Sequence, residues 1–347
     1  MREGIPAEDR CEKGFSHQQE SLRLGKDKDM SSSAVIFPGQ GSQSVGMGRD
    51  VAVASKRARV VFDRANDLLG FDLAELCFEG PADQLEKTDI QQPAIFVVSV
   101  AIWEAFIEAG GRREQFAWTG GLSLGEYTAL HVAGAVEFGE ALRLVRRRGQ
   151  LMQEASVVSP SGMVSLVGAD EASARALCDR ARGDAVLAPA NFNCPGQVVI
   201  SGNLEACDRA AELASEYGCR AVALPVAGAF HSPLMEPAAR GLEPVLTETE
   251  FKVPMLAVVS NVDAEKHGEP ITIRDSLRRQ MTQPVLWQRC AERMIAEGVD
   301  QFFEMGPGRV LSGLIRKIDR KIPTVSVNTT DAITGATDRL AARSKGP

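Results

Sequence analysis

Residues 120–127 read GGLSLGEY and place Ser123 in a G-x-S-x-G frame. A short β-prone segment at residues 116–119 precedes the frame, and a helical pattern at residues 128–133 follows it. A strand, a tight glycine turn and a helix are the setting in which this frame forms a nucleophile elbow. Gly121 and Gly125 stand where larger residues would block the sharp turn. The pattern therefore predicts that Ser123 lies exposed at a helix N-terminus, where a developing negative charge is stabilised.

The frame also fits an ordinary glycine-rich turn, so a nearby base is needed to support a nucleophilic serine. The chain has four histidines. His17 lies in a polar N-terminal stretch, His267 lies in a charged turn, and His131 lies about two helical turns beyond Ser123 with its ring directed away. His231 follows an apolar run and lies in a loop with glycine and proline, where scaffolds commonly present catalytic groups. We expect His231 to be the general base, with a structural hydrogen bond as the alternative role.

Arg148 lies on the apolar face of a helix predicted for residues 137–155. Ala141, Val145 and Met152 share that face at helical spacing, whereas the neighbouring arginines do not. A buried guanidinium is costly unless it is paired, and its planar fork suits a carboxylate. Arg148 is therefore either a snorkelling or internally paired structural arginine or a clamp for an anionic substrate, and spacing alone does not decide.

Several motifs extend this pattern along the chain. FPGQGSQ stands at residues 37–43, RRRGQLMQ surrounds Arg148, and GAFHSPLM surrounds His231; NFNCPGQVVISG, SNVDA, RRQMTQPVLW and FFEMGPGRVLSGLIRKI also occur. In this order they resemble the malonyl-CoA:acyl-carrier-protein transacylases, an acyltransferase family of fatty-acid and polyketide synthesis. The resemblance runs from about Ser33 to the C-terminal region. Leu122 stands where the family usually has histidine, and we expect altered packing there without loss of activity.

The resemblance implies a role for each matching residue. Ser123 would be the nucleophile and His231 its base, while the backbone N–H groups of Gln40 and Leu124 would form the oxyanion hole. Arg148 would hold the malonyl carboxylate.

The same resemblance implies that Ser123 and His231 act as a dyad. A main-chain carbonyl near Gln280, and no aspartate, would orient the histidine. Phe230 would crowd a methyl branch at C2 of the acyl group, so selection of malonyl over methylmalonyl should be real but incomplete. Gln280 and Asn193 are also expected among the substrate-binding residues.

The implied reaction is a ping-pong transfer of malonyl from malonyl-CoA to the phosphopantetheine thiol of acyl carrier protein. It requires no metal or redox cofactor, because CoA is a substrate. A methylmalonyl- or polyketide-dedicated acyltransferase is the alternative within the family, and a serine thioesterase or other hydrolase, or a non-catalytic carrier-binding scaffold, is the alternative outside it. Because acyl carrier proteins are acidic, docking calls for a local basic patch, with Arg146, Arg147 and the charged cluster at residues 316–321 as candidates.

Composition limits the class of protein. The chain has 347 residues, 44% hydrophobic and 24% charged, with a net charge of −7 that argues against nucleic acid as a partner. Its seven scattered cysteines include no C-x-x-C pair, which favours reduced thiols in a cytoplasmic protein and offers no zinc-site spacing. No run approaches the roughly 18 consecutive apolar residues of a membrane span. We expect a monomer.

The predicted fold is α/β. Residues 1–31 are polar and read as a disordered extension without a signal peptide. Residues 32–158 and 227–335 should form an α/β-hydrolase-like large domain, and residues 159–226 an inserted ferredoxin-like small domain with the order β-α-β-β-α-β. The active site should lie in the cleft between the two domains.

Overall fold

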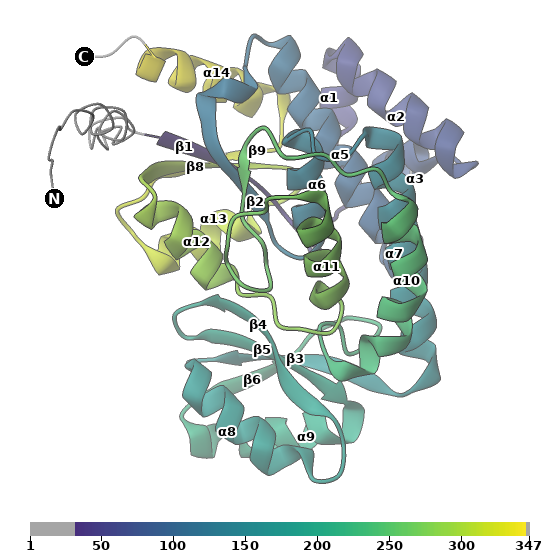
Figure 1. Cartoon of the computed structure of the whole chain (residues 1–347), viewed down its shortest axis with the longest axis vertical. Helices are drawn as coiled ribbons and strands as arrows, with labels where there is room; N and C mark the ends of the chain where they lie inside the picture. Colours follow the sequence, from purple (N-terminus) through teal and green to yellow (C-terminus); the bar gives the residue numbers. More distant parts are fainter. Residues whose placement is uncertain (1–31, 345–347) are drawn as a thin grey trace, which may run out of the picture. The chain divides into compact units, whose positions relative to one another are not determined.

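A five-stranded parallel sheet forms the centre of the computed structural model, which describes residues 32–344 (Figure 1). Its strand order is β7-β2-β1-β8-β9. The strands are β1 (Ser32–Phe37), β2 (Phe116–Gly121), β7 (Ala257–Val258), β8 (Val299–Met305) and β9 (Thr324–Val327). Because all strands run in one direction, the loops after β1 and β2 emerge at the same edge of the sheet. The predicted extension at residues 1–31 and His17 within it lie outside the described residues.

The central strand β1 is buried on both faces, as parallel strands usually are. Ala34 and Ile36 pack on one face against α12 and α13, whereas Val35 and Phe37 pack on the other face into a core that includes α5 and α7. This alternation follows the two-residue repeat of a strand.

Within residues 32–344, twelve helices belong to the part of the chain that contains the parallel sheet. They are α1 (Arg49–Ala54), α2 (Lys56–Leu69), α3 (Leu73–Glu79), α4 (Ala82–Leu85), α5 (Thr88–Glu108), α6 (Leu124–Val132), α7 (Phe138–Val158), α10 (Glu236–Glu248), α11 (Pro270–Gln280), α12 (Trp287–Ala296), α13 (Val310–Ile318) and α14 (Thr330–Ser344), with 3-10 turns at Arg113–Gln115 and Pro233–Met235.

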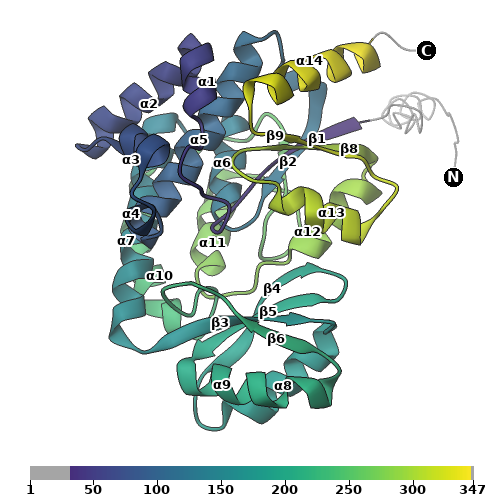
Figure 2. The same cartoon turned by 180° about the vertical axis from the view of Figure 1, so that it is seen from behind.

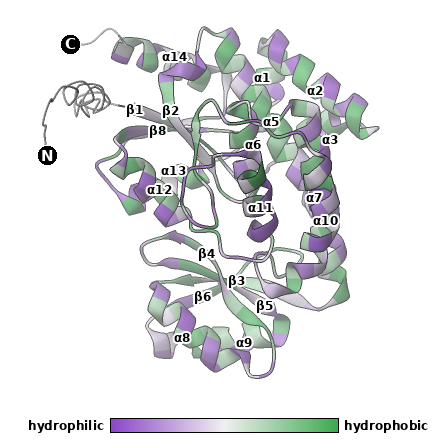
Figure 3. Cartoon of the chain, viewed as in Figure 1, coloured by the Kyte–Doolittle hydropathy of each residue, from purple (hydrophilic) through white to green (hydrophobic). Residues whose placement is uncertain are grey.

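A second, antiparallel sheet has the order β4-β5-β3-β6. Its elements are β3 (Ser161–Val167), α8 (Glu171–Arg182), β4 (Leu187–Cys194), β5 (Gln197–Asn203), α9 (Leu204–Leu213), a 3-10 turn (Ala214–Tyr217) and β6 (Arg220–Ala223). Figure 1 and Figure 2 show α8 and α9 side by side on the face of this sheet that is turned away from the parallel sheet. Both helices are amphipathic, and Figure 3 shows hydrophobic and hydrophilic residues alternating along them. An α/β fold with a parallel sheet and a separate antiparallel sheet is confirmed; the domain boundaries stay a prediction.

Helix α5 is buried on nearly every face. In the described part of the chain it is the one helix long and apolar enough to cross a membrane, but 83% of its apolar window is buried inside the protein. Ser99 and Glu104 interrupt its apolar run. This degree of burial is typical of the core helix of a globular protein.

Regular structure continues past residue 335, where sequence analysis ended the large domain. Helix α14 runs to Ser344 and places Ile333, Ala336 and Leu340 in the core. The final helix gives a weak signal in the sequence because it is polar and its few apolar residues are widely spaced.

Candidate active site

Ser123 lies between the end of β2 and the start of α6, with φ 52° and ψ −98°. A positive φ is unfavourable for serine and marks a strained turn of the kind that presents a nucleophile. Glycine is required at positions 121 and 125, because other backbone atoms lie too close to leave room for a Cβ atom. A Cβ on Gly121 would lie 2.2 Å from the Gly125 carbonyl carbon, and one on Gly125 would lie 2.1 Å from the Phe37 oxygen.

The loop after β1 passes directly beside this turn. The Leu122 N–H donates to the Phe37 carbonyl at 3.2 Å, and a Cβ on Gly39 would lie 2.4 Å from the Leu122 oxygen. Gln40 directly follows Gly39 in this loop, and the Leu124 N–H lies in the first turn of α6, where it has no partner within the helix. The two N–H groups expected for the oxyanion hole belong to these two segments: Gln40 lies in the loop after β1, and Leu124 lies at the start of α6.

His231 lies within hydrogen-bonding distance of the serine. Its Nε2 is 2.8 Å from Ser123 Oγ, and its Nδ1 is 2.7 Å from the Gln280 main-chain oxygen. A carbonyl accepts only, so Nδ1 carries the proton and Nε2 is free to accept one from the serine. The structure thus brings Ser123, His231 and the Gln280 carbonyl together in the arrangement that the resemblance implied.

Arg148 lies on the buried face of α7, and 1% of the residue is exposed. Its Nη1 donates to Gln92 Oε1 at 2.6 Å, and its Nη2 donates to Ser123 Oγ at 2.9 Å and Gln280 Oε1 at 3.0 Å. Its guanidinium also lies over the ring of Tyr127, 5.2 Å from the centroid. All three hydrogen-bond acceptors are neutral, so the described part of the chain gives this buried cation no carboxylate partner. The buried carboxylate of Glu126 acts on Arg148 electrostatically but forms no hydrogen bond with it. A buried cation next to a nucleophile with no bonded carboxylate favours an anionic substrate.

The surroundings of His231 keep it neutral. Burial, and next the positive charge of Arg148, lower the pKa of His231 from 6.5 to about 4, although the Gln280 carbonyl opposes the shift. At neutral pH the imidazole is therefore unprotonated and able to act as a base.

The other predicted residues lie close to this site in the fold. Phe230 is buried beside His231 and belongs to the main core. Asn193 lies on β4, nearly buried, and its Oδ1 has no partner within residues 32–344. Leu122 is half-buried and packs against the core cluster that contains Val285.

Three comparisons with known proteins agree with this geometry. Residues 35–331 match the family model described as an acyl transferase domain. The chain belongs to this acyl transferase family. It is 41% identical over 308 residues to the malonyl CoA-acyl carrier protein transacylase of Escherichia coli (strain K12), covering 88% of this chain and 99% of the relative. It is also 41% identical to the transacylase of the same name from Bacillus subtilis (strain 168), covering 88% and 96%.

Solved structures of the acyl transferase family share the fold. The malonyl CoA-acyl carrier protein transacylase of Coxiella burnetii matches with a TM-score of 0.87 and 38% identity, covering 89% of this chain and 98% of that one. A malonyl-transacylase in complex with its type II PKS acyl-carrier protein matches with a TM-score of 0.86 and 41% identity, covering 89% and 100%. The resemblance inferred from the motifs is confirmed.

Sequence reasoning missed several residues that complete this acyl transferase site. Asn261 Oδ1 accepts the Ser123 N–H at 2.7 Å, and its Nδ2 donates to the Gly121 oxygen at 2.9 Å. Asn261 lies in the SNVDA motif, to which no role was assigned. Gln92 was hidden inside the apolar segment of α5, where a side-chain amide produces no periodic signal.

His267 lies in a charged irregular segment, as expected, but its own side chain is buried. Its side chain is 1% exposed, and its Nε2 lies 2.6 Å from Glu126 Oε1. The charged residues around it in sequence are solvent-facing, but the imidazole turns inward toward α6. The charges of the neighbouring residues in the sequence do not reveal that this side chain points into the protein.

The candidate docking arginines of this acyl transferase differ in their pairing. Arg146 pairs with Asp89 at 3.2 Å and Arg147 with Glu154 at 3.2 Å. In the charged cluster at the end of α13, Arg316, Arg320 and Lys321 are exposed. The cluster therefore presents more basic side chains without an ion-pair partner among the described residues than Arg146 and Arg147 do.

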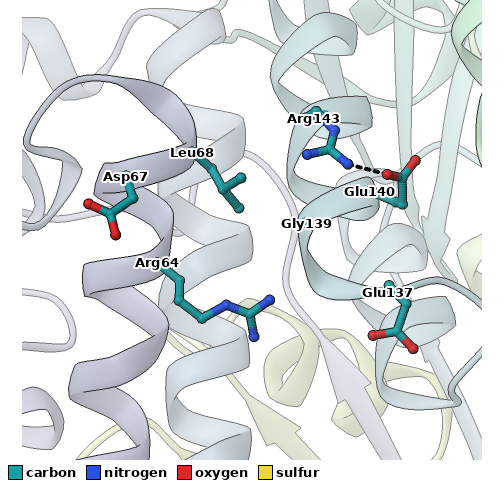
Figure 4. A pocket seen from close by; sticks show the side chains of 7 residues that line it. All are labelled: Arg64, Asp67, Leu68, Glu137, Gly139, Glu140 and Arg143. Carbon is teal, nitrogen blue, oxygen red and sulfur yellow. Dashed lines mark hydrogen bonds and ion pairs between the residues drawn. The ribbon is translucent and has the colours of Figure 1, made fainter.

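A separate cavity of about 430 Å³ lies between α2 and α7 (Figure 4). It is lined by Arg64, Asp67, Leu68, Glu137, Gly139, Glu140 and Arg143, and Arg143 pairs with Glu140 along the wall formed by α7. None of these residues is a serine, cysteine or histidine, and none belongs to the site around Ser123. We assign this cavity no catalytic role.

The low pKa of His231 predicts the pH dependence of this acyl transferase. The value of kcat/KM for acylation should stay level from neutral pH downward and fall only as the pH approaches about 4, since the free enzyme loses activity when His231 becomes protonated. Stopped-flow acylation across this range tests the prediction, with enzyme returned from each pH to neutral pH as a control for unfolding. An acid limb near the ordinary histidine value would contradict it.

Proposed function

We propose that this protein transfers the malonyl group of malonyl-CoA to the phosphopantetheine thiol of acyl carrier protein through a malonyl-Ser123 intermediate. The observation that carries the proposal is the buried guanidinium of Arg148, 2.9 Å from Ser123 Oγ and bonded only to neutral side chains. A malonyl thioester places a carboxylate next to the carbonyl that Ser123 would attack. Arg148 would bind that carboxylate with both arms of its fork.

In the first half-reaction, Ser123 Oγ attacks the thioester carbonyl and His231 Nε2 takes the hydroxyl proton. The carbonyl oxygen becomes negative in the tetrahedral intermediate, and the N–H groups of Gln40 and Leu124 would stabilise it. The intermediate collapses by breaking the carbon–sulfur bond. The proton on His231 passes to the departing sulfur, and CoA leaves as a thiol.

The second half-reaction reverses these roles. The phosphopantetheine thiol of the carrier protein attacks the malonyl ester carbonyl while His231 takes the thiol proton. The carbon–oxygen bond to Ser123 breaks, and His231 returns the proton to Oγ. No step requires a metal or redox cofactor, because side chains and backbone N–H groups perform every proton transfer and charge stabilisation.

We infer that the antiparallel sheet with α8 and α9 is a ferredoxin-like small domain at residues 159–226, inserted into an α/β-hydrolase-like large domain. The element order β3-α8-β4-β5-α9-β6 supports this description. Ser123, Arg148 and Gln280 come from the large part, while Asn193 comes from β4, so the acyl group would bind between the two parts.

Bulk beside the catalytic base supports malonyl as the acyl group. Phe230 immediately precedes His231 and is buried, so a methyl branch at C2 would meet its ring. One methyl group changes specificity by only ~1–3 kcal/mol, and methylmalonyl should remain a slow substrate. Fatty-acid synthesis is the proposed setting, with a polyketide-dedicated acyltransferase as the alternative.

The six cysteines in residues 32–344 are free and buried, which supports a reducing, cytoplasmic location. We expect the enzyme to act as a monomer.

The test is a product assay with malonyl-CoA, with and without carrier protein bearing phosphopantetheine. The proposal predicts rapid formation of malonyl-carrier protein and little free malonate. A serine hydrolase would release malonate at a rate unchanged by carrier protein, and that result would overturn the assignment. Methylmalonyl-CoA in the same assay separates the two candidate acyl groups.

A further inference from the structure

A fully buried carboxylate lies directly behind the nucleophile. Glu126 is on α6, three residues after Ser123, and is 0% exposed. Its Oε1 lies 2.6 Å from His267 Nε2, while its Oε2 accepts from Gln280 Nε2 at 2.7 Å and from the Asn261 N–H at 3.2 Å. Donors from two segments outside α6 therefore converge on one carboxylate. The reaction scheme above does not use it.

Gln280 connects this carboxylate to all three residues of the site. Its main-chain oxygen lies 2.7 Å from His231 Nδ1, its Nε2 donates to the Ser123 oxygen at 3.0 Å, and its Oε1 accepts from Arg148 Nη2 at 3.0 Å. Because Nε2 also donates to Glu126, the amide of Gln280 cannot rotate without breaking several bonds. Glu126 thus fixes the side-chain amide of Gln280, which contacts Ser123 and Arg148, in a residue whose main-chain oxygen contacts His231.

Asn261 provides a second connection from Glu126 to the elbow. Its backbone N–H donates to Glu126, and its side chain bonds the Ser123 N–H and the Gly121 oxygen on both sides of the strained turn. A serine held at φ 52° needs such support, because the surrounding structure must over-determine an unfavourable backbone conformation.

We propose that Glu126 and His267 form a buried positioning pair that holds Gln280 and Asn261, and through them the Ser123–His231 dyad, in the geometry for acyl transfer. This inference rests on the proposed function. A carboxylate oxygen accepts, so the 2.6 Å contact assigns the donor role to Nε2–H of His267. Without it, one carboxylate oxygen loses its only described side-chain donor, and the carboxylate is free to turn away from Gln280.

The experiment compares His267→Gln with His267→Asn. The amide nitrogen of glutamine reaches about as far as histidine Nε2, whereas that of asparagine ends near Nδ1, so only glutamine can donate to Glu126. His131→Asn is the matched control, because His131 is also mostly buried but bonds the Val136 carbonyl and packs against Phe96 and Phe138, with no hydrogen bond to Glu126, Gln280 or Asn261. Acylation by malonyl-CoA is followed in single turnovers over a range of concentrations, and the melting temperature of each variant is recorded.

We expect His267→Asn to lower the maximal acylation rate about 10- to 100-fold, since small displacements of reacting groups have effects of this size. The half-saturating malonyl-CoA concentration should change by less than about threefold, because Arg148 keeps its contact with Gln92. His267→Gln should stay within about threefold of the parent in rate, and His131→Asn should keep the parent rate even where its melting temperature falls.

Equal rates for His267→Asn and His267→Gln, whatever their melting temperatures, would overturn the positioning role. So would a His267→Asn variant that melts lower but acylates at the parent rate. The parent enzyme separates this failure from that of the proposed function. If the parent forms no malonyl adduct the proposed function fails, and if it forms one while all variants match it, only the positioning pair fails.

Discussion

Replacing His231 with alanine should slow acylation of Ser123 by about 10²- to 10⁴-fold, the usual contribution of a positioned general base. The serine hydroxyl is a weak nucleophile, and His231 Nε2 at 2.8 Å is the acceptor placed to remove its proton. Stopped-flow measurement of CoA release, or timed mass spectrometry of the adduct, gives the rate.

His131→Ala is the control for this prediction, because it removes a mostly buried imidazole from the helix that follows the elbow. It should leave the rate within about twofold of the parent. If His131→Ala were as damaging as His231→Ala, the choice of base would be wrong.

Arg148→Ala should reduce malonyl transfer by orders of magnitude while acetyl-CoA is used at least as well as by the parent. Arg148 is the buried cation beside Ser123, and breaking a desolvated charge pair typically costs ~3–5 kcal/mol. Acetyl has no carboxylate and should lose nothing comparable. The measurement is the ratio of kcat/KM for malonyl-CoA to that for acetyl-CoA.

Two further variants separate a substrate clamp from a structural cation. Arg148→Lys should recover little malonyl activity, because a point charge cannot reproduce the planar fork. Arg148→Met should keep the melting temperature near that of the parent, since it fills the space and removes a buried charge to which no carboxylate is bonded. Parallel loss of malonyl and acetyl activity together with a lower melting temperature would assign Arg148 a structural role.

The elements that sequence predicted well are those whose signal is local. The nucleophile elbow depends on glycines adjacent to Ser123, and the structure shows the backbone contacts that exclude a side chain at both. Arg148 interrupts the apolar stripe of one helix, so its place on the inward face of α7 follows from spacing, although its role does not. The helix expected first in the β-α-β-β-α-β order is α8, whose start is capped by Asp170 and whose end is followed by Gly183.

The partners that act over long separations could not be predicted in the same way. Glu126 and His267 are 141 residues apart, and the charged residues around His267 suggest an exposed position for it. Whether a charged residue is buried depends on what the rest of the chain brings to it. The Gln280 carbonyl was anticipated only through the family resemblance, since a main-chain oxygen has no signature in the sequence.

The central claim is that malonyl is carried on Ser123 between two thiols. Intact-mass spectrometry of the enzyme mixed with malonyl-CoA, followed by addition of carrier protein bearing phosphopantetheine, tests it most directly. The account predicts one added malonyl mass on the parent enzyme, none on Ser123→Ala, and complete loss of the adduct as the carrier protein gains the same mass. An adduct that persists in Ser123→Ala, or one that carrier protein does not discharge, would contradict the account.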